Sequence, residues 1–153
     1  MNRIFNILIL LSFMVIVAFD SNNCDEAIKK CNKMLIPYYY DLSEVTEIRY
    51  KGVEYKINDM EVTLYFGEKY RFVFNTENLS ENIIIEIYNK KYNSDKKELV
   101  FTNRNNLNKR TYIFEPKKSR TLYVNYIIPA GTVGDIGCAA FVLGYEIKKP
   151  FKN

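Results

Sequence analysis

The chain has 153 residues, the length of one domain, and its 48% hydrophobic and 26% charged residues are typical of a globular protein and exclude a disordered one. The 22 basic and 18 acidic residues give a net charge of only +4, and both signs are mixed along the chain. This pattern predicts neither a nucleic-acid-binding surface nor a membrane-binding one. The aromatic residues are 13 Tyr and 10 Phe, which favour β-strands.

The sequence contains no histidine. Its absence excludes Ser-His-Asp and Cys-His catalysis as well as histidine-ligated zinc, and no phosphate-binding glycine motif is present. The acidic pairs Asp59 with Glu61 and Glu44 with Glu47 leave a carboxylate-based hydrolase as the least favoured hypothesis. We therefore expect a protein that is not an enzyme and has no catalytic residue, metal site or cofactor.

The first residues have the form of a secretory signal peptide. Arg3 precedes an apolar run over residues 4–19 that is shorter than the roughly 20 residues of a membrane-spanning helix. We predict a signal peptide over residues 1–19, cut after Ala18, and a secreted, periplasmic or cell-surface protein. A leader retained as a membrane anchor is the alternative. The residues before Cys24 do not form a lipoprotein signal.

One short amphipathic helix follows the leader. Its apolar residues recur at helical spacing, as Cys24, Ala27, Ile28, Cys31, Met34 and Leu35. Pro37 is expected to end the helix. We assign residues 20–43 to this helix and its connector.

The three cysteines of an exported chain are expected to meet an oxidising environment. Cys24 and Cys31 lie seven residues apart, about 10 Å along a helix, whereas a disulfide needs Cα atoms at about 4.4–6.8 Å. One of them should therefore pair with Cys138 and the other stay free. We favour Cys31–Cys138 over Cys24–Cys138, and three unpaired thiols are the alternative.

Three consecutive tyrosines follow the helix, Tyr38, Tyr39 and Tyr40. Exposed tyrosines stack on sugar rings or anchor a protein partner, which makes them the candidate binding residues. Alternatively, one or two of them fill the end of the core where the helix joins the sheet.

Beyond the helix the hydrophobic period changes to two. The segments that alternate in this way predict about eight strands. They include Ile48 with Tyr50 and residues 53–57, 62–66, 70–74, 83–87, 99–101, 112–114, 122–126 and 138–148. Lys51 and Gly52 suggest a hairpin turn between the first two. The last strand is apolar on both faces and should be central. We predict an all-β, antiparallel, jelly-roll-like sandwich over residues 44–149.

Four segments together resemble a known group of proteins: residues 62–74 (VTLYFGEKYRFVF), the isoleucine-rich strand after them, residues 119–124 (SRTLYV) and residues 137–145 (GCAAFVLGY). The chain resembles small secreted proteins of uncharacterised function that are common in Bacteroidetes. More loosely, it is similar to the jelly-roll-like pre-peptidase C-terminal domain of secreted peptidases. The resemblance covers roughly residues 24–148, and it implies a β-sandwich, an extracytoplasmic location and a non-enzymatic accessory role.

Two functions are consistent with this reading. The first is a secreted or cell-envelope binding module for a protein partner or a glycan. The alternative is a structural component of a cell-surface complex that pairs with its neighbour through an exposed sheet edge. An exposed aromatic patch would favour the first function, and an unprotected edge strand the second.

Overall fold

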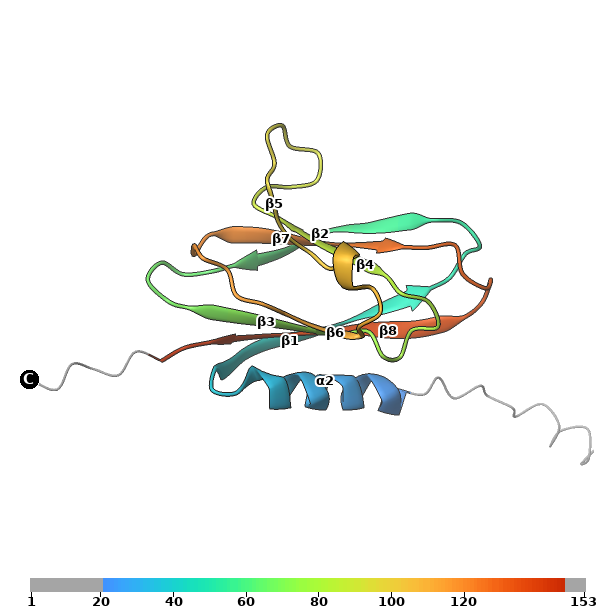
Figure 1. Ribbon diagram of the computed structural model, residues 1–153, viewed down its shortest axis with the longest axis horizontal. Helices are drawn as coiled ribbons and strands as arrows, with labels where there is room; N and C mark the ends of the chain where they lie inside the picture. Colours follow the sequence, from blue (N-terminus) through green and yellow to red (C-terminus); the bar gives the residue numbers. More distant parts are fainter. Residues whose placement is uncertain (1–20, 148–153) are drawn as a thin grey trace, which may run out of the picture.

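The computed structural model describes residues 21–147, so the predicted signal peptide over residues 1–19 lies outside the described part. Two four-stranded antiparallel sheets face each other, and one helix lies on the outer face of one sheet (Figure 1). The predicted all-β sandwich with one short N-terminal helix is confirmed.

The elements follow one another in the order helix and then strands. They are α2 (Ser21–Leu35), β1 (Tyr39–Arg49), β2 (Tyr55–Thr63), β3 (Tyr70–Asn75), β4 (Ile84–Tyr88), β5 (Leu99–Thr102), the 3-10 helix η1 (Arg104–Asn106), β6 (Thr111–Phe114), β7 (Thr121–Ile128) and β8 (Ile136–Tyr145). β1 begins at Tyr39, so the sandwich starts before the expected residue 44 and the connector after α2 is short.

The strand order defines the topology. One sheet has the order β1-β8-β3-β6 and the other β2-β7-β4-β5. The first strand therefore pairs with the last, the second with the seventh, the third with the sixth and the fourth with the fifth, as in a long hairpin rolled up into a jelly roll.

The predicted hairpin around Lys51 and Gly52 is wrong. β1 pairs with β8, and β2 pairs with β7 in the other sheet. The segment between them crosses from one sheet to the other, with Gly52 at φ 73°. Two successive strands show the same period-two pattern in the sequence whether they pair with each other in one sheet or face each other across a core.

β8 is central and covered on both faces, as predicted. It lies between β1 and β3. Ala139, Phe141 and Leu143 belong to the core between the sheets, whereas Ala140 and Val142 pack under the helix. These alternating sides explain why the strand reads as apolar throughout.

The apolar stripe of α2 packs against this sheet. The buried cluster between them consists of Ala27, Cys31, Leu35, Val73, Ala140 and Val142. The helix ends at Leu35, ahead of Pro37, as expected. Burial of one helix face fixes α2 along β8 and β3 (Figure 1).

The preferred disulfide, Cys31–Cys138, is wrong. Cys24 is bonded to Cys138 with a Cα–Cα distance of 6.0 Å, and Cys31 is a free, buried thiol. α2 runs along β8 so that its last residue, Leu35, lies against Gly144. Its first turn therefore reaches Cys138, and Cys31 lies about 10 Å further along the sheet. The expectation that one cysteine pairs with Cys138 and the other stays free is confirmed.

The polar segment over residues 89–97 forms a loop, as expected, and projects from the sandwich (Figure 1). Asp59 holds it, because its carboxylate accepts a hydrogen bond from the backbone N–H of Tyr92 at 2.7 Å. Asp59 lies at an irregularity of β2 with φ 63°, where the Asn125 side chain accepts its N–H at 2.8 Å. This acidic residue thus has a structural role in the loop.

Candidate functional site at the β1 edge

β1 is the most exposed strand of the sandwich and an edge of its sheet. Among the described residues it pairs only with β8. Eleven residues from Tyr39 to Arg49 run along this edge, and most of their side chains are exposed. A strand of this kind presents unpaired backbone groups to solvent, which another extended chain can bind.

The backbone direction decides which groups are free. Tyr50 donates its N–H to the Asp135 carbonyl at 2.9 Å, so the residue after β1 points its backbone groups toward β8. In an antiparallel pair these directions alternate along the strand. Ser43, Val45 and Glu47 therefore direct their N–H and C=O groups away from β8, where no described residue pairs with them.

At the C-terminal end of β1, the side chain of Tyr55 binds the outward backbone groups of the edge. The Tyr55 hydroxyl accepts a hydrogen bond from the Arg49 N–H at 3.3 Å and donates one to the Arg49 carbonyl at 2.9 Å. The open stretch therefore ends before Arg49. A β-bulge between Tyr40 and Leu42, where Asp41 is the additional residue, limits it at the other end.

Apolar side chains flank the open stretch. Tyr39 is 56% exposed, Tyr40 54%, Leu42 38% and Val45 43%. Successive side chains of a strand point to opposite faces, so these residues lie on both sides of the free edge. A chain that pairs with β1 would find apolar contacts on either side of its backbone.

The three predicted binding tyrosines lie in two different environments. The Tyr38 ring is half-buried against α2, and the Arg71 guanidinium lies 4.3 Å from its centroid. Burial first, and then the Glu115 carboxylate, raise the pKa of Tyr38. Tyr39 lies beside Tyr145, at 6.5 Å between ring centroids, and the Tyr40 hydroxyl is 3.0 Å from the Ser43 hydroxyl. Tyr38 thus belongs to the helix–sheet junction, whereas Tyr39 and Tyr40 border the open edge.

Arg71 fixes the entry of the chain into β1. Its Nη1 donates to the Ile36 carbonyl at 2.8 Å and to the Met34 carbonyl at 3.3 Å, next to the end of α2. Its Nη2 forms an ion pair with Glu115 at 2.6 Å. Because Arg71 also covers Tyr38, one side chain orders the whole turn between α2 and β1.

Gly144 brings the helix and β1 close to β8. A Cβ atom at this position would lie 2.7 Å from both a Leu35 methyl carbon and the Tyr39 carbonyl oxygen. Such contacts are far shorter than van der Waals separations. Only glycine allows the end of α2 and the start of β1 to pack in this way.

The open edge is acidic although the protein is basic. Asp41, Glu44 and Glu47 lie along it, and the one ion pair among them joins Glu47 to Arg49 at 3.1 Å. Glu44 and Glu47 fall on opposite faces of the strand, so they do not flank one cleft as the hydrolase hypothesis requires. The remaining two carboxylates make no ion pair with a described residue.

Sequence reasoning named Tyr38, Tyr39 and Tyr40 as candidate binding residues but missed the edge that Tyr39 and Tyr40 border, including Leu42 and Val45. The signal for a strand is weak here, because the bulge at Asp41 interrupts the alternation. The absence of glycine and proline from residues 39 to 49, together with several β-branched and aromatic residues, is the feature that could have indicated one long strand.

Within residues 21–147, no group of three His, Cys, Asp or Glu residues is arranged to hold a metal ion. In the same part of the chain, no helix has both the length and the apolar character needed to cross a bilayer. No protein-family model and no curated protein matches the sequence, so the resemblance described above stays a prediction.

Proposed function

We propose that this protein is a non-catalytic binding module that works outside the cytoplasm and recruits an extended, basic segment of a partner protein to β1. The observation that carries the proposal is the open edge, where Ser43, Val45 and Glu47 direct unpaired backbone groups to solvent between exposed apolar side chains. Backbone pairing supplies affinity in such complexes, and the flanking side chains supply specificity.

The charge of the edge favours a basic occupant. Asp41 and Glu44 make no ion pair with a described residue, and Glu47 has only the exposed Arg49 as partner. Lys or Arg side chains on a paired strand would lie directly opposite these carboxylates, where opposite charges stabilise and like charges destabilise.

The same charges disfavour a second copy of this chain. In the antiparallel register that places Glu44 of one copy opposite Glu44 of the other, Asp41 of each copy would also lie opposite Glu47 of its partner. Like-charged residues opposite each other in a sheet are destabilising. The proposed occupant is therefore a different protein.

The Cys24–Cys138 disulfide supports a location outside the cytoplasm, because such bonds form and persist in oxidising compartments. The signal-peptide form of residues 1–19 points the same way. We propose that the protein is secreted or attached to the cell envelope.

Two other roles use the same region. A structural component of a cell-surface complex would also pair through β1, but it would stay bound at fixed stoichiometry. A glycan-binding module would use the exposed rings of Tyr39 and Tyr40 and would need no backbone pairing. The two roles differ from the main proposal in stoichiometry and in dependence on the backbone.

The test compares variants in an affinity capture from an envelope extract of the source cells. Val45→Pro removes an outward N–H, and proline is tolerated at such positions of edge strands. Val45→Thr is the matched control, because it keeps the β-branched shape and the N–H. We expect the wild type and Val45→Thr to retain the same protein and Val45→Pro to lose it.

A second variant keeps the test decisive if Val45→Pro does not fold. Asp41→Lys/Glu44→Lys reverses the edge charge without touching the backbone, and it should also lose the partner. Thermal unfolding checks that each variant is folded. Equal capture by the wild type and the folded variants would overturn the proposal, as would retention of glycan alone.

A further inference from the structure

A pocket of about 330 Å³ opens at the other side of the sandwich, away from β1. It lies between the edge strands β5 and β6 and is bordered by the turn over residues 115–120. The two short strands belong to different sheets, and their ends leave the core partly uncovered. The volume is at the small end of the roughly 300–1,000 Å³ typical of ligand sites.

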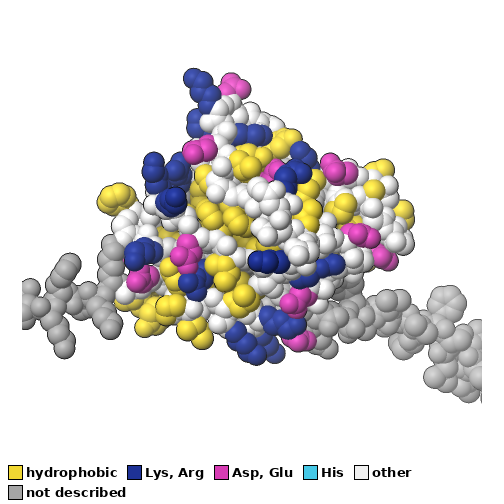
Figure 2. Space-filling view, viewed as in Figure 1, with side chains coloured by type: hydrophobic (Ala, Val, Ile, Leu, Met, Phe, Trp, Pro, Cys, Tyr) yellow, Lys and Arg dark blue, Asp and Glu magenta, His cyan; other side chains and the backbone are white. Residues whose placement is uncertain are grey.

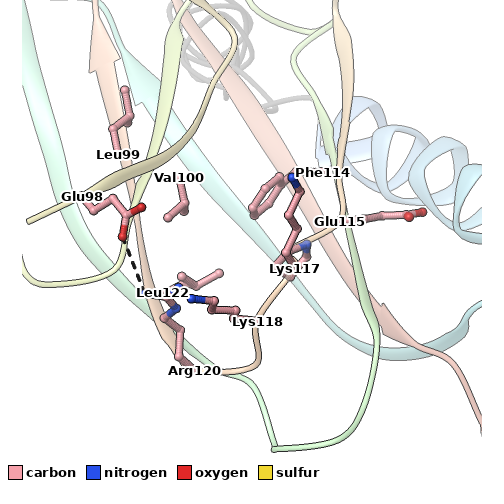
Figure 3. Close-up of a pocket in the computed structure, with 10 residues that line it drawn as sticks. Glu98, Leu99, Val100, Phe114, Glu115, Lys117, Lys118, Arg120 and Leu122 are labelled. Atoms are coloured by element: carbon pink, nitrogen blue, oxygen red, sulfur yellow. Dashed lines mark ion pairs between the residues drawn. The ribbon is translucent and has the colours of Figure 1, made fainter.

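The floor of the pocket is apolar and rigidly held. Val100, Phe114 and Leu122 line it between the two sheets (Figure 3). The Phe114 ring packs against Phe72 at 5.6 Å and Phe101 at 5.1 Å between centroids. Because these contacts already hold the Phe114 ring in place, a ligand that binds here loses little free energy to the ordering of side chains.

The rim of the pocket is basic. Lys117, Lys118 and Arg120 border it, and Figure 2 shows hydrophobic side chains at the middle of this face with Lys and Arg side chains beside them. The combination of an apolar floor with a few charged groups is typical of sites that orient a ligand by one polar end.

The two acidic residues at the rim are already engaged. Arg120 lies 3.9 Å from Glu98, which also accepts a hydrogen bond from the Asn89 side chain at 3.1 Å. Glu115 points away from the pocket and pairs with Arg71 at 2.6 Å (Figure 3). Lys117 and Lys118 make no ion pair with a described residue, so two positive charges remain for a ligand.

We propose that this pocket binds a small apolar carboxylate, such as a medium-chain fatty acid. The hydrocarbon part contacts Phe114, Val100 and Leu122, and the carboxylate lies at the rim beside Lys117 and Lys118. The volume is too small for a two-chain lipid, which restricts the ligand to a single short chain or ring. This site is separate from β1 and does not depend on the role proposed for that strand.

The test is a titration of the isotope-labelled protein with sodium decanoate, followed by backbone amide NMR. Decyltrimethylammonium has the same chain with the opposite charge and serves as the matched ligand. We expect decanoate to shift amides at residues 98–100 and 114–122 and to bind more tightly than the cation.

The matched variants separate a site from unspecific binding. Lys117→Gln/Lys118→Gln should weaken decanoate binding by about fivefold, as expected for two exposed charge contacts, and should not weaken binding of the cation, because it removes two charges that repel the cation. Lys29→Gln/Lys109→Gln removes two exposed lysines elsewhere and should change nothing. Equal affinities for the two ligands, no effect of the first variant, shifts outside the pocket, or no shifts up to about 10 mM would each overturn the proposal.

Discussion

The disulfide between Cys24 and Cys138 ties the first turn of α2 to β8, the strand that holds the open edge β1 in place. The bond closes a loop with a sequence separation of 114 residues. It thus links the N-terminal helix to the central strand of the sheet that carries the candidate site.

Removing this bond should lower the stability strongly. For the variant Cys24→Ala/Cys138→Ala we expect the free energy of unfolding to fall by about 4–5 kcal/mol, because the unfolded chain regains the entropy of a long loop. Urea denaturation measures the change. Cys31→Ala is the control and should cost roughly 1 kcal/mol, the value for a small buried side chain. A loss no larger than that of the control would contradict this account of the bond.

The remaining cysteine should be inert in the folded protein. Cys31 is fully buried, and burial followed by the nearby Glu77 carboxylate raises the pKa of its thiol to about 12. Because the thiolate is the reactive form, a disulfide reagent at pH 8 should find no accessible thiol. After denaturation without reductant, it should titrate one thiol per chain. Rapid labelling of the folded protein, or three thiols after denaturation, would show that the cysteines are arranged otherwise.

Stability should fall at alkaline pH. Cys31 and the fully buried Tyr126 are neutral when protonated, and burial raises the pKa of each above its usual value. The unfolded chain releases these protons from about pH 9, whereas the folded protein holds them to higher pH. The unfolded state therefore binds fewer protons, and the free energy of unfolding declines as pH rises from about 9 to about 12.

Denaturation curves at several pH values measure this decline. Tyr126→Phe keeps the ring and removes the titrating hydroxyl, so the decline should become shallower in this variant. Tyr65→Phe, at an exposed position, is the control and should leave the slope unchanged. An identical slope in all three proteins would exclude Tyr126 as a source of the pH dependence.

Gly144→Ala should be destabilising although no cavity is created. The new methyl group would meet a Leu35 methyl carbon and the Tyr39 carbonyl oxygen, each at 2.7 Å, and overpacking of this kind costs about 1–3 kcal/mol. Thermal unfolding measures the loss. Leu35→Ala is itself destabilising because Leu35 is buried, but the loss in the double variant should be smaller than the sum of the two single losses, since the shorter side chain leaves room for the methyl group. Strictly additive effects of the two changes would contradict the proposed contact.

The sequence was sufficient for the elements of the fold but not for their pairing. The apolar stripe of α2 and the continuous apolar run of β8 identified both elements, and the apolar character of both faces of β8 predicted its central position. The hairpin prediction around Gly52 failed because alternation does not distinguish strands that pair from strands that face each other across the core. The disulfide partner depended on the direction of α2 over the sheet, which helical spacing alone does not reveal.

The candidate site was predictable only in part. Tyr39 and Tyr40 are conspicuous in the sequence, but their exposure follows from the position of β1 at the sheet edge. The sheet topology sets that position: β1 pairs with β8 on one side and with no described strand on the other. The pocket depends likewise on the two short edge strands β5 and β6, which no local pattern brings together.

The most direct test of the open edge is amide hydrogen exchange along β1, measured by NMR in the free protein and with the captured partner bound. In the free protein, Ser43, Val45 and Glu47 should exchange rapidly, whereas Thr46 and Ile48 should be protected by their bonds to β8. We expect the bound partner to slow exchange of the first three amides by at least about tenfold. Unchanged exchange at these amides, with new protection elsewhere, would contradict it.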